Sequence, residues 1–341
     1  MPHTDAPAPD WGALVAELAG RCLLVLGDVM LDEYVAGEAR RVCPEAPVPV
    51  VEATARWAVP GGAANAAANA AALGARAVLG GATGADPGAG ALARAARDRG
   101  VDPAGLVPDP GRPTTSKLRV LARGQQITRV DTESTGPVTG EPAERLGAWA
   151  ERALAGAGAV LLSDYGKGLF AGPLAPRVLG AAARAGRPVV VDPKGTDPDR
   201  YRGAAVVKPN LAELGDLTGL PVRTGEQFRR AGLRLAGRLP GTAVLVTRGG
   251  DGMVLFRAGA DPRALPGGPV HAVCDVTGAG DTAAAALALG LAAGWAVELA
   301  ARVANAAAGV AVCKVGTAVV APAELRAALG PGVPDFGPLT D

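Results

Sequence analysis

The chain has 341 residues, of which 49% are hydrophobic but only 3% aromatic, so we expect a core built mainly from Ala, Val and Leu. Its 34 basic and 33 acidic residues leave a net charge of +1, and no basic block could neutralise a row of phosphates, which argues against a nucleic-acid partner. No apolar run reaches the length of a membrane span, and the N-terminus lacks the pattern of a signal peptide, so we expect a cytoplasmic protein with no membrane partner.

The two ends of the chain are predicted to be flexible tails around one folded domain. Residues 1–12 are rich in Pro, Ala and Asp, and residues 329–341 read LGPGVPDFGPLTD. Both compositions are typical of frayed ends. We therefore expect the domain to cover residues 13–328.

The cysteines and histidines exclude several kinds of site. Cys22, Cys43, Cys274 and Cys313 are far apart and form no C-x-x-C pair. We therefore predict reduced, mostly buried thiols and neither a disulfide framework nor a structural zinc site. The sequence contains two histidines, at positions 3 and 271, which argues against a Ser-His-Asp triad.

Short apolar segments that end in polar residues recur along the chain and predict buried strands. Glycine turns and alanine-rich segments separate them, an alternation that favours a mostly parallel sheet with helices on both faces. The predicted strands cover residues 21–28, 75–84, 158–166, 187–195, 204–210 and 242–252. In such sheets ligands bind at the carboxyl ends of the strands. The polar residues at these ends are Asp28, Asp164, Asp192, Lys194, Asn210, Thr247 and Arg248.

Two segments, 33–52 and 113–131, break this rhythm. They are richer in Pro, Val, Thr and charge and alternate with a period of two, which predicts a small separate sheet that we interpret as a lid over the strand ends. Lys117, Arg119 and Arg129 alternate along the lid strands. From the residues alone, these cations are expected to form a solvated face.

The stretch PGGAANAAANAAALGA, residues 60–75, places two glycines before an alanine-rich helix. Gly61 and Gly62 let the backbone approach a ligand closely, and the amide of Asn65 can hydrogen-bond the ligand's hydroxyls. Asp28 can accept hydrogen bonds from a polyol. Asp32 can do the same, and for this residue a surface cap is the alternative.

The stretch CDVTGAGDTAAAALALG, residues 274–290, sets a Gly-Ala-Gly turn before a run of helix formers. The amides of Gly278, Ala279 and Gly280 are expected at a helix N-terminus, where unpaired N–H groups and the helix dipole attract a phosphate or an oxyanion. Asp281 then lies in the first turn. It either caps the helix or takes a proton from a hydroxyl held beside these amides.

Other classes of nucleotide site fit less well. GAGDTA, residues 278–283, matches the G-x-G-x-x-A of dinucleotide-binding enzymes, but the acidic strand end expected about 20 residues later is absent because Glu298 falls in helical sequence. No G-x-x-x-x-G-K-[ST] occurs, which excludes a P-loop kinase. A non-catalytic sugar-binding regulatory protein is a further alternative, against which the intact Asp281 argues.

The motifs of this chain resemble those of the ribokinase-like (PfkB) carbohydrate kinases. DVTGAGDT and PGGAANAAANAAALGA are similar to the two signatures of that family. Further stretches resemble the heptose 7-phosphate kinases within it, and these are GDVMLDEYVAGEARRVCPEAPVPVV, TTSKLRVLARGQQITRVD, LLSDYGKG, DPKGTDPDRYRGA, PNLAE and ANAAAGVAVCKVGT. The resemblance runs from about residue 20 to about residue 328 and implies a three-layer α/β/α domain with a central, mostly parallel sheet and a small β-sheet lid.

The resemblance also implies a role for each candidate residue. Asp281 would be the catalytic base, and the amides of residues 278–280 would form an anion hole. The sugar side would consist of Asp28, Asp32, Gly61, Gly62, Asn65, Lys117, Arg119 and Arg129. The last three, the lid cations, would recognise the phosphate that the substrate already carries. The nucleotide side would consist of Lys194, Asn210, Glu213, Thr247, Arg248, Gly249, Gly278, Gly280 and Asn305. Asn210 and Glu213 would organise Mg²⁺ through its waters, and Asp275 and Thr277 would belong to a loop that binds a monovalent cation such as K⁺.

The activity implied by the resemblance is the ATP- and Mg²⁺-dependent phosphorylation of D-glycero-β-D-manno-heptose 7-phosphate at its anomeric hydroxyl. The product would be the 1,7-bisphosphate, an intermediate of nucleotide-activated heptose biosynthesis. A kinase for another sugar, sugar phosphate or nucleoside is the alternative, against which the lid motifs argue. A homodimer formed through the lid is the expected assembly.

Overall fold

A large central sheet organises the computed structural model, which describes residues 9–268, 273–330 and 332–339. Within these residues ten strands follow the order β14-β13-β12-β11-β10-β9-β8-β1-β4-β5. Neighbouring strands from β5 to β11 are parallel, and β12, β13 and β14 continue the sheet in antiparallel pairs. The strands are β1 (Cys22–Gly27), β4 (Arg76–Thr83), β5 (Val101–Pro108), β8 (Ala159–Ser163), β9 (Val189–Asp192), β10 (Val206–Val207), β11 (Ala243–Thr247), β12 (Met253–Phe256), β13 (Arg263–Leu265) and β14 (Gly337–Pro338).

The six strands predicted from the sequence are confirmed, because β1, β4, β8, β9, β10 and β11 each lie within a predicted segment. The local sequence does not predict β5, which occupies the edge of the sheet. Its sequence, VDPAGLVP, contains two prolines and a glycine. Proline cannot donate to a strand ladder and is tolerated at an edge, so the local sequence masks a strand that the neighbouring β4 stabilises.

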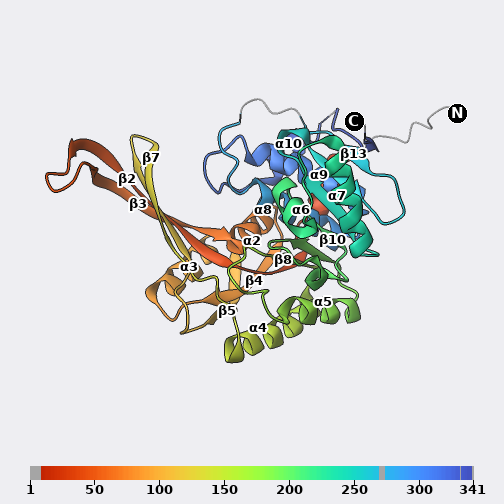
Figure 1. Cartoon of the computed structure of the whole chain (residues 1–341), viewed down its shortest axis with the longest axis horizontal. Helices are drawn as coiled ribbons and strands as arrows, with labels where there is room; N and C mark the ends of the chain where they lie inside the picture. Colours follow the sequence, from red (N-terminus) through yellow and green to blue (C-terminus); the bar gives the residue numbers. More distant parts are fainter. Residues whose placement is uncertain (1–8, 269–272, 331, 340–341) are drawn as a thin grey trace.

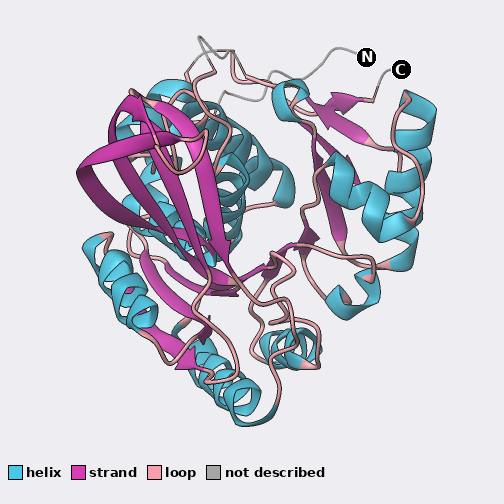
Figure 2. Ribbon diagram, turned by 60° about the vertical axis from the view of Figure 1, so that its left-hand side comes forward, coloured by secondary structure: helices cyan, strands magenta, loops and turns pink. Residues whose placement is uncertain are grey.

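Helices cover both faces of the central sheet (Figure 2). Helices α2, α3, α8 and α9 share one hydrophobic core with the sheet, whereas α4, α5, α6 and α7 share the other. The helices are α1 (Trp11–Glu17), α2 (Ala63–Ala72), α3 (Pro87–Asp98), α4 (Gly140–Ala153), α5 (Leu174–Arg184), α6 (Leu211–Thr218), α7 (Gly225–Arg238), α8 (Ala279–Ala292), α9 (Val297–Ala311) and α10 (Pro322–Ala328), with short 3-10 turns at Leu154–Gly156, Pro198–Tyr201 and Gly249–Asp251. These layers are the α/β/α arrangement that the sequence predicts.

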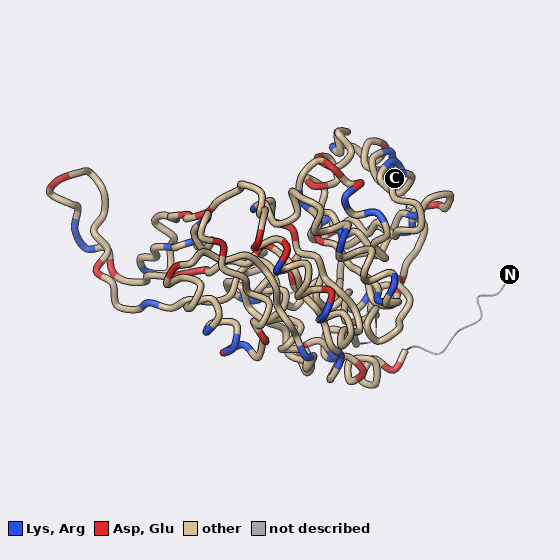
Figure 3. The backbone as a smooth tube through the Cα atoms, turned by 90° about the horizontal axis from the view of Figure 1, so that it is seen from below, with Lys and Arg blue, Asp and Glu red and all other residues tan. Residues whose placement is uncertain are grey.

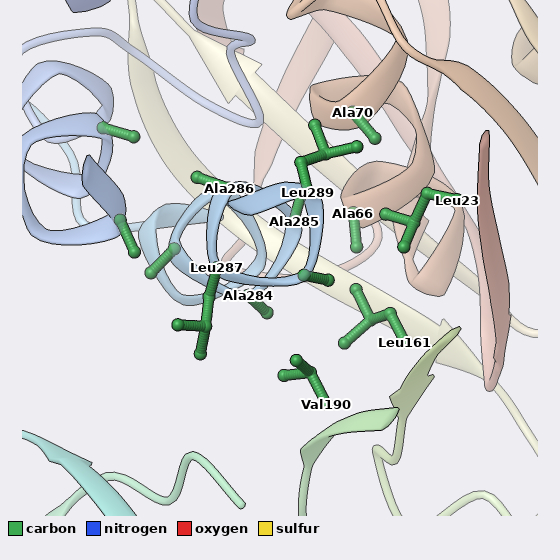
Figure 4. Packing of buried hydrophobic residues seen from close by; sticks show 14 of the residues in the cluster. Leu23, Ala66, Ala70, Leu161, Val190, Ala284, Ala285, Ala286, Leu287 and Leu289 are labelled. Atoms are coloured by element: carbon green, nitrogen blue, oxygen red, sulfur yellow. The ribbon is translucent and has the colours of Figure 1, made fainter. Parts of the chain in front are cut away.

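Small side chains allow α8 to pack closely inside its core. Its alanines lie against α2 and against side chains of the sheet such as Leu161 and Val190 (Figure 4). A Cβ added to Gly290 would lie 2.7 Å from the Cβ of Ala300 in α9. The alanine and glycine content therefore sets how closely α8 approaches its neighbours and, with this, where its N-terminus lies.

A second, smaller sheet projects from the main body (Figure 1). Its described strands follow the order β3-β2-β6-β7 and are β2 (Val29–Val42), β3 (Pro49–Gly62), β6 (Ser116–Ala122) and β7 (Gln125–Thr132). The strands β2 and β3 extend beyond the predicted segment, because β2 starts immediately after β1 and β3 continues to α2. Gly61 and Gly62 consequently end a strand and do not form a separate loop.

The predicted tails are partly ordered. Helix α1 begins at Trp11, two residues before the predicted start of the domain. Within the predicted C-terminal tail, β14 pairs with β13, and Phe336 is buried beneath the Arg263 guanidinium. Residues 332–339 are therefore not a loose tail. Both histidines and the outermost residues of both predicted tails lie outside the described residues.

The four cysteines are free thiols, but the prediction that most are buried is wrong. Cys22 and Cys43 are half-buried, and Cys274 and Cys313 are exposed, because they lie at a strand start, in the long hairpin and near helix ends. Among the helices of the described ranges, none is long and apolar enough to cross a membrane.

Candidate active site

A cavity of about 710 Å³ opens at the carboxyl ends of the parallel strands. This volume lies in the range of small-molecule sites, roughly 300–1,000 Å³. Of the predicted site residues, those lining it are Lys194, Asn210, Glu213, Thr247, Arg248, Gly249, Gly278, Ala279, Gly280, Asp281 and Asn305. The predicted catalytic and nucleotide-side residues thus share one cavity, to which strand ends, α6, α8 and α9 contribute.

The N-terminus of α8 forms one wall of this cavity. Gly278 is the N-cap residue and has φ 80°, ψ −3°, a left-handed conformation that glycine adopts without strain. A Cβ on Gly278 would also lie 2.8 Å from Nδ2 of Asn65. Glycine is therefore required at position 278 for two reasons, the left-handed backbone and the closeness of Asn65. The turn leaves the first amides of α8 without helical partners, as an anion site requires.

Asp281 is buried at the base of this wall and holds two side-chain hydrogen bonds. Its Oδ1 accepts a bond of 2.5 Å from the Tyr165 hydroxyl, and its Oδ2 accepts one of 2.7 Å from Nδ2 of Asn65. Neither bond caps the backbone of α8. The geometry therefore favours a carboxylate that is held in place for a function in the cavity.

Burial raises the pKa of the Asp281 carboxyl to about 7, and the negative charge of Asp192 acts in the same direction. The hydrogen bonds from Tyr165 and Asn65 and the positive charge of Lys208 oppose this rise. A carboxylate with a pKa near 7 is a stronger proton acceptor than an ordinary aspartate, and it is half ionised at that pH.

Asp28 supports a loop and does not face the cavity directly. Its Oδ2 accepts the backbone N–H groups of Tyr165 (2.8 Å) and Lys167 (3.0 Å), and its Oδ1 accepts that of Leu169 (3.4 Å). Asp164 holds the same loop by accepting the N–H of Gly166 at 2.7 Å. This arrangement does not favour the predicted direct contact between Asp28 and a sugar, which stays a prediction.

A buried ion pair lies next to the start of α8. Nζ of Lys208 is 2.9 Å from Oδ1 of Asp192, and it lies 3.9 Å from the position that a Cβ on Gly280 would take. The Lys208 side chain is 3% exposed. Burial raises the pKa of the Asp192 carboxyl to about 6, against the opposing charge of Lys208. A fixed cation thus stands beside the amides where an anion would bind.

Asn210 and Glu213 form a reciprocal capping box at the start of α6. Oδ1 of Asn210 accepts the Glu213 N–H, and Oε2 of Glu213 accepts the Asn210 N–H, both at 2.9 Å. Nζ of Lys194 lies 3.3 Å from the other oxygen of Glu213. Asn210 and Glu213, the pair predicted to organise the metal, are thus in direct contact, and they also cap the N-terminus of α6.

Further predicted residues surround the cavity opening. Asn305 donates to the carbonyl oxygen of Pro266 at 2.9 Å, and Arg248 packs over the Phe228 ring. Val273 and Val276, exposed by 64% and 70%, also line the cavity. Exposed apolar side chains at a cavity mouth suit a flat, partly apolar group such as a nucleobase.

Asp275 ties two loops together outside the cavity. Its Oδ1 accepts the Thr277 N–H and its Oδ2 accepts the Gly316 N–H, both at 2.9 Å. Both carboxylate oxygens are therefore engaged with backbone. Binding of a monovalent cation by Asp275 and Thr277 stays a prediction.

On the small sheet, Asp32 and Arg119 form a buried ion pair at 2.5 Å. Gly61 makes room for it, because a Cβ at that position would collide with the Asp32 carboxylate. The Arg119 guanidinium also lies over the Tyr34 ring. The surface-cap alternative for Asp32 is thereby excluded: its side chain is 5% exposed and paired with a cation.

The other predicted lid cations are also paired. Nζ of Lys117 lies 2.9 Å from Asp131 and 3.3 Å from Glu133, and Arg129 makes two hydrogen bonds to Asp131, of 2.7 and 2.9 Å. Figure 3 shows that basic and acidic residues are interspersed along this part of the chain. A substrate phosphate that bound these cations would have to share them with the carboxylates of Asp131 and Glu133 or displace those carboxylates.

The cavity residues fit a nucleotide with Mg²⁺. In the part of the chain that the structure describes, no three His, Cys, Asp or Glu side chains gather as a protein-enclosed metal site requires. Mg²⁺ usually keeps several waters and binds one or two carboxylates together with phosphates. Asn210 and Glu213 offer oxygens of this kind, while Lys194, Lys208 and the α8 amides offer positive charge and donors for phosphates.

Comparison with known proteins identifies the family of this chain. The model of the pfkB family carbohydrate kinases matches residues 22–324. The chain belongs to the PfkB family of carbohydrate kinases. This membership makes the protein an ATP-dependent sugar kinase, in agreement with the buried carboxylate beside the α8 amides.

Relatives within the PfkB family cover nearly all of this chain. The "Bifunctional protein HldE" of Azorhizobium caulinodans is 48% identical over 93% of this chain and 66% of its own length. The protein of the same name from Caulobacter vibrioides is 46% identical over 91% of this chain and 63% of its own length. The chain thus spans just under two thirds of these relatives, which are longer.

Solved PfkB-type structures share the fold. Arabidopsis thaliana ribokinase complexed with ribose and ATP superposes with a TM-score of 0.70 at 26% identity, covering 91% of this chain and 99% of the ribokinase. Escherichia coli phosphofructokinase-2 in complex with potassium gives 0.73 at 20% identity, covering 91% and 98%. The ribokinase-like architecture with its separate small sheet is therefore confirmed.

Two residues of this PfkB site, Lys208 and Tyr165, are not among those predicted from the sequence. Lys208 directly follows β10 and Tyr165 stands two residues after β8, close in sequence to the predicted residues Asn210 and Asp164. Their position as polar residues at the carboxyl end of a buried strand was the sequence signal that could have identified them as site residues. Their partners, Asp192 and Asp281, are close only in the folded chain.

Proposed function

We propose that the protein transfers the γ-phosphoryl group of ATP to the anomeric hydroxyl of D-glycero-β-D-manno-heptose 7-phosphate, giving the 1,7-bisphosphate. The observation that carries the kinase chemistry is the buried Asp281 carboxylate beside the first turn of α8, where the amides of Gly278 and Gly280 have no helical partner. The heptose motifs of the sequence and the identity to the HldE proteins support the choice of acceptor.

Each group of the site has a part in this reaction. Asp281 takes the proton of the acceptor hydroxyl as its oxygen bonds to phosphorus and the bond to the ADP oxygen breaks. The amides of Gly278 to Gly280, together with Lys208, stabilise the negative charge of the phosphoryl group. Bound Mg²⁺ would offset further phosphate charge, with Asn210 and Glu213 holding its waters.

One observation favours a different acceptor. Lys117, Arg119 and Arg129 all have carboxylate partners, as they would if they supported the small sheet and did not recognise a phosphate. An unphosphorylated sugar or a nucleoside is then the alternative. A panel of heptose 7-phosphate, fructose 6-phosphate, ribose and adenosine with ATP decides between them. We expect the highest kcat/KM for heptose 7-phosphate; faster turnover of ribose or adenosine would contradict the assignment.

The lid cations provide a second test. If Lys117 and Arg119 bind the 7-phosphate, replacing either with Ala should raise KM roughly tenfold or more, since a charge-assisted hydrogen bond contributes about 1.5–3 kcal/mol. The increase should disappear with unphosphorylated heptose. Arg40→Ala, which removes an exposed cation of the same sheet, is the control. Equal effects on both substrates would mean that these cations only support the sheet.

The assembly and location belong to this proposal as well. Large apolar side chains are exposed on the small sheet and in the turn between β2 and β3, and these are Val42, Val48, Trp57, Ile127 and Val130. Such a surface supports a homodimer formed through this sheet. A cytoplasmic location, where ATP is available, stays a prediction.

A further inference from the structure

The hydroxyl of Tyr165 contacts the atom on which the proposed chemistry depends. It donates to Oδ1 of Asp281 at 2.5 Å, while Asn65 donates to Oδ2. Each carboxylate oxygen thus has one fixed donor and keeps capacity for another. Burial, and then the charge of Asp281, raises the pKa of the Tyr165 phenol, so that it remains a donor when the carboxylate ionises.

The loop that carries Tyr165 is unusually well supported. Its backbone N–H groups at positions 165, 167 and 169 all donate to the buried Asp28, which directly follows β1, and the N–H of Gly166 donates to Asp164. Two strand-end carboxylates therefore fix a five-residue segment. A tyrosine needed only for packing would not require this support from charged groups.

We propose that Tyr165 is a positioning residue: its hydroxyl orients the Asp281 carboxylate toward the acceptor hydroxyl, and Asp28 maintains this geometry by holding the loop. The inference rests on the proposed function of Asp281 as base. It gives Asp28 a role in the site that differs from a direct contact with sugar.

The decisive change is Tyr165→Phe, which removes the hydroxyl and keeps the ring. Without this donor the pKa of Asp281 should rise further, because one of the hydrogen bonds that counteract the effect of burial is lost. The charges of Asp192 at the end of β9 and of Lys208 after β10 still act on Asp281. The acid limb of the kcat/KM profile should move up by about one pH unit, since a hydrogen bond to a charged group has roughly that effect. At pH 7 the loss of kcat/KM should be roughly fivefold, and it should shrink above pH 8.

Tyr201→Phe is a matched control. Tyr201 is fully buried and donates to Oδ2 of Asp164 at 2.6 Å, so the same substitution weakens one support of the Tyr165 loop but removes no donor from Asp281. It should leave the acid limb in place. An equal shift in both variants, or none in Tyr165→Phe, would overturn the proposal.

A second readout requires no substrate. The Asp281 carboxyl can be titrated by NMR with ¹³C-labelled aspartate, its signal being assigned by its loss in Asp281→Asn. The midpoint should rise in Tyr165→Phe and fall when 3-fluorotyrosine, a stronger donor, replaces Tyr165. If the titration midpoint of Asp281 is unchanged in both proteins, the proposal is contradicted, even if activity falls. If no acceptor in the panel is phosphorylated, the proposed function fails, while this titration still tests the role of Tyr165.

A different result would show that Tyr165 blocks the site. If its hydroxyl merely occupies the place of the acceptor on Asp281, then Tyr165→Phe should lower KM for the acceptor and leave the acid limb unchanged. That combination contradicts a positioning role, which predicts a change in the pH profile with little change in KM.

Discussion

Replacing Asp281 with Asn should lower kcat by about 10²- to 10⁴-fold, the usual contribution of a general base, while ATP and the acceptor still bind. The amide keeps the shape of the carboxylate but accepts no proton. Steady-state kinetics with the best acceptor, together with calorimetric binding of ATP, separate the two effects. A variant that keeps most of its kcat would make Asp281 a structural residue.

The same change should stabilise the fold in alkaline buffer. The pKa of Asp281 is raised to about 7 in the folded chain, so the folded state binds more protons than the unfolded state between about pH 4 and pH 7, and the free energy of unfolding falls as pH rises through this window. Asn removes the cost of the buried charge. The melting temperature should therefore increase at pH 8 and change less at pH 5.

Asp216→Asn is the control for both measurements, because Asp216 is an exposed residue on α6. It should change neither kcat nor the pH dependence of melting. The opposite signs expected for Asp281→Asn, a loss of activity with a gain in stability, are typical of a residue kept for function at a cost to the fold.

Replacing Lys208 with Met should destabilise the protein by up to about 3 kcal/mol, because it removes the direct partner of the largely buried Asp192 carboxylate and leaves only the more distant charge of Lys194. Met has a similar length and leaves no large cavity. The loss should be larger at pH 8 than at pH 5, since without Lys208 the Asp192 carboxyl, whose pKa is already raised to about 6, takes up a proton more readily. Chemical denaturation at both pH values measures the difference.

Lys208→Met combined with Asp192→Asn should recover most of this stability, because no unpaired charge remains. Binding of ATP should be weakened in Lys208→Met and equally in the double variant, since both lack the cation beside the first turn of α8. Full recovery of ATP binding would mean that Lys208 serves only to neutralise Asp192 and makes no contact with phosphate.

Much of the architecture follows from local sequence. Six strands coincide with apolar runs that end in polar residues, because a strand buried on both faces needs a continuous apolar sequence. The turn at Gly278 and the position of Asp281 in the first turn of α8 were also predictable, since a glycine turn before a run of helix formers is a local signal. The proline-containing β5 was not, because its pairing with β4 outweighs its poor strand propensity.

The partners of the site residues were decided only by the tertiary structure. Asn65 and Asp281 are 216 positions apart, and Tyr165 and Asp281 are 116 apart, so no local pattern connects them. Asp28 resembled a sugar ligand in sequence, yet the fold brings three backbone amides to it. The sequence by itself determined which residues stand at the strand ends and at the start of α8. Which of them face the cavity, which support it and how their pKa values shift depends on burial and distance, and these arise only when the sheet and its helices pack together.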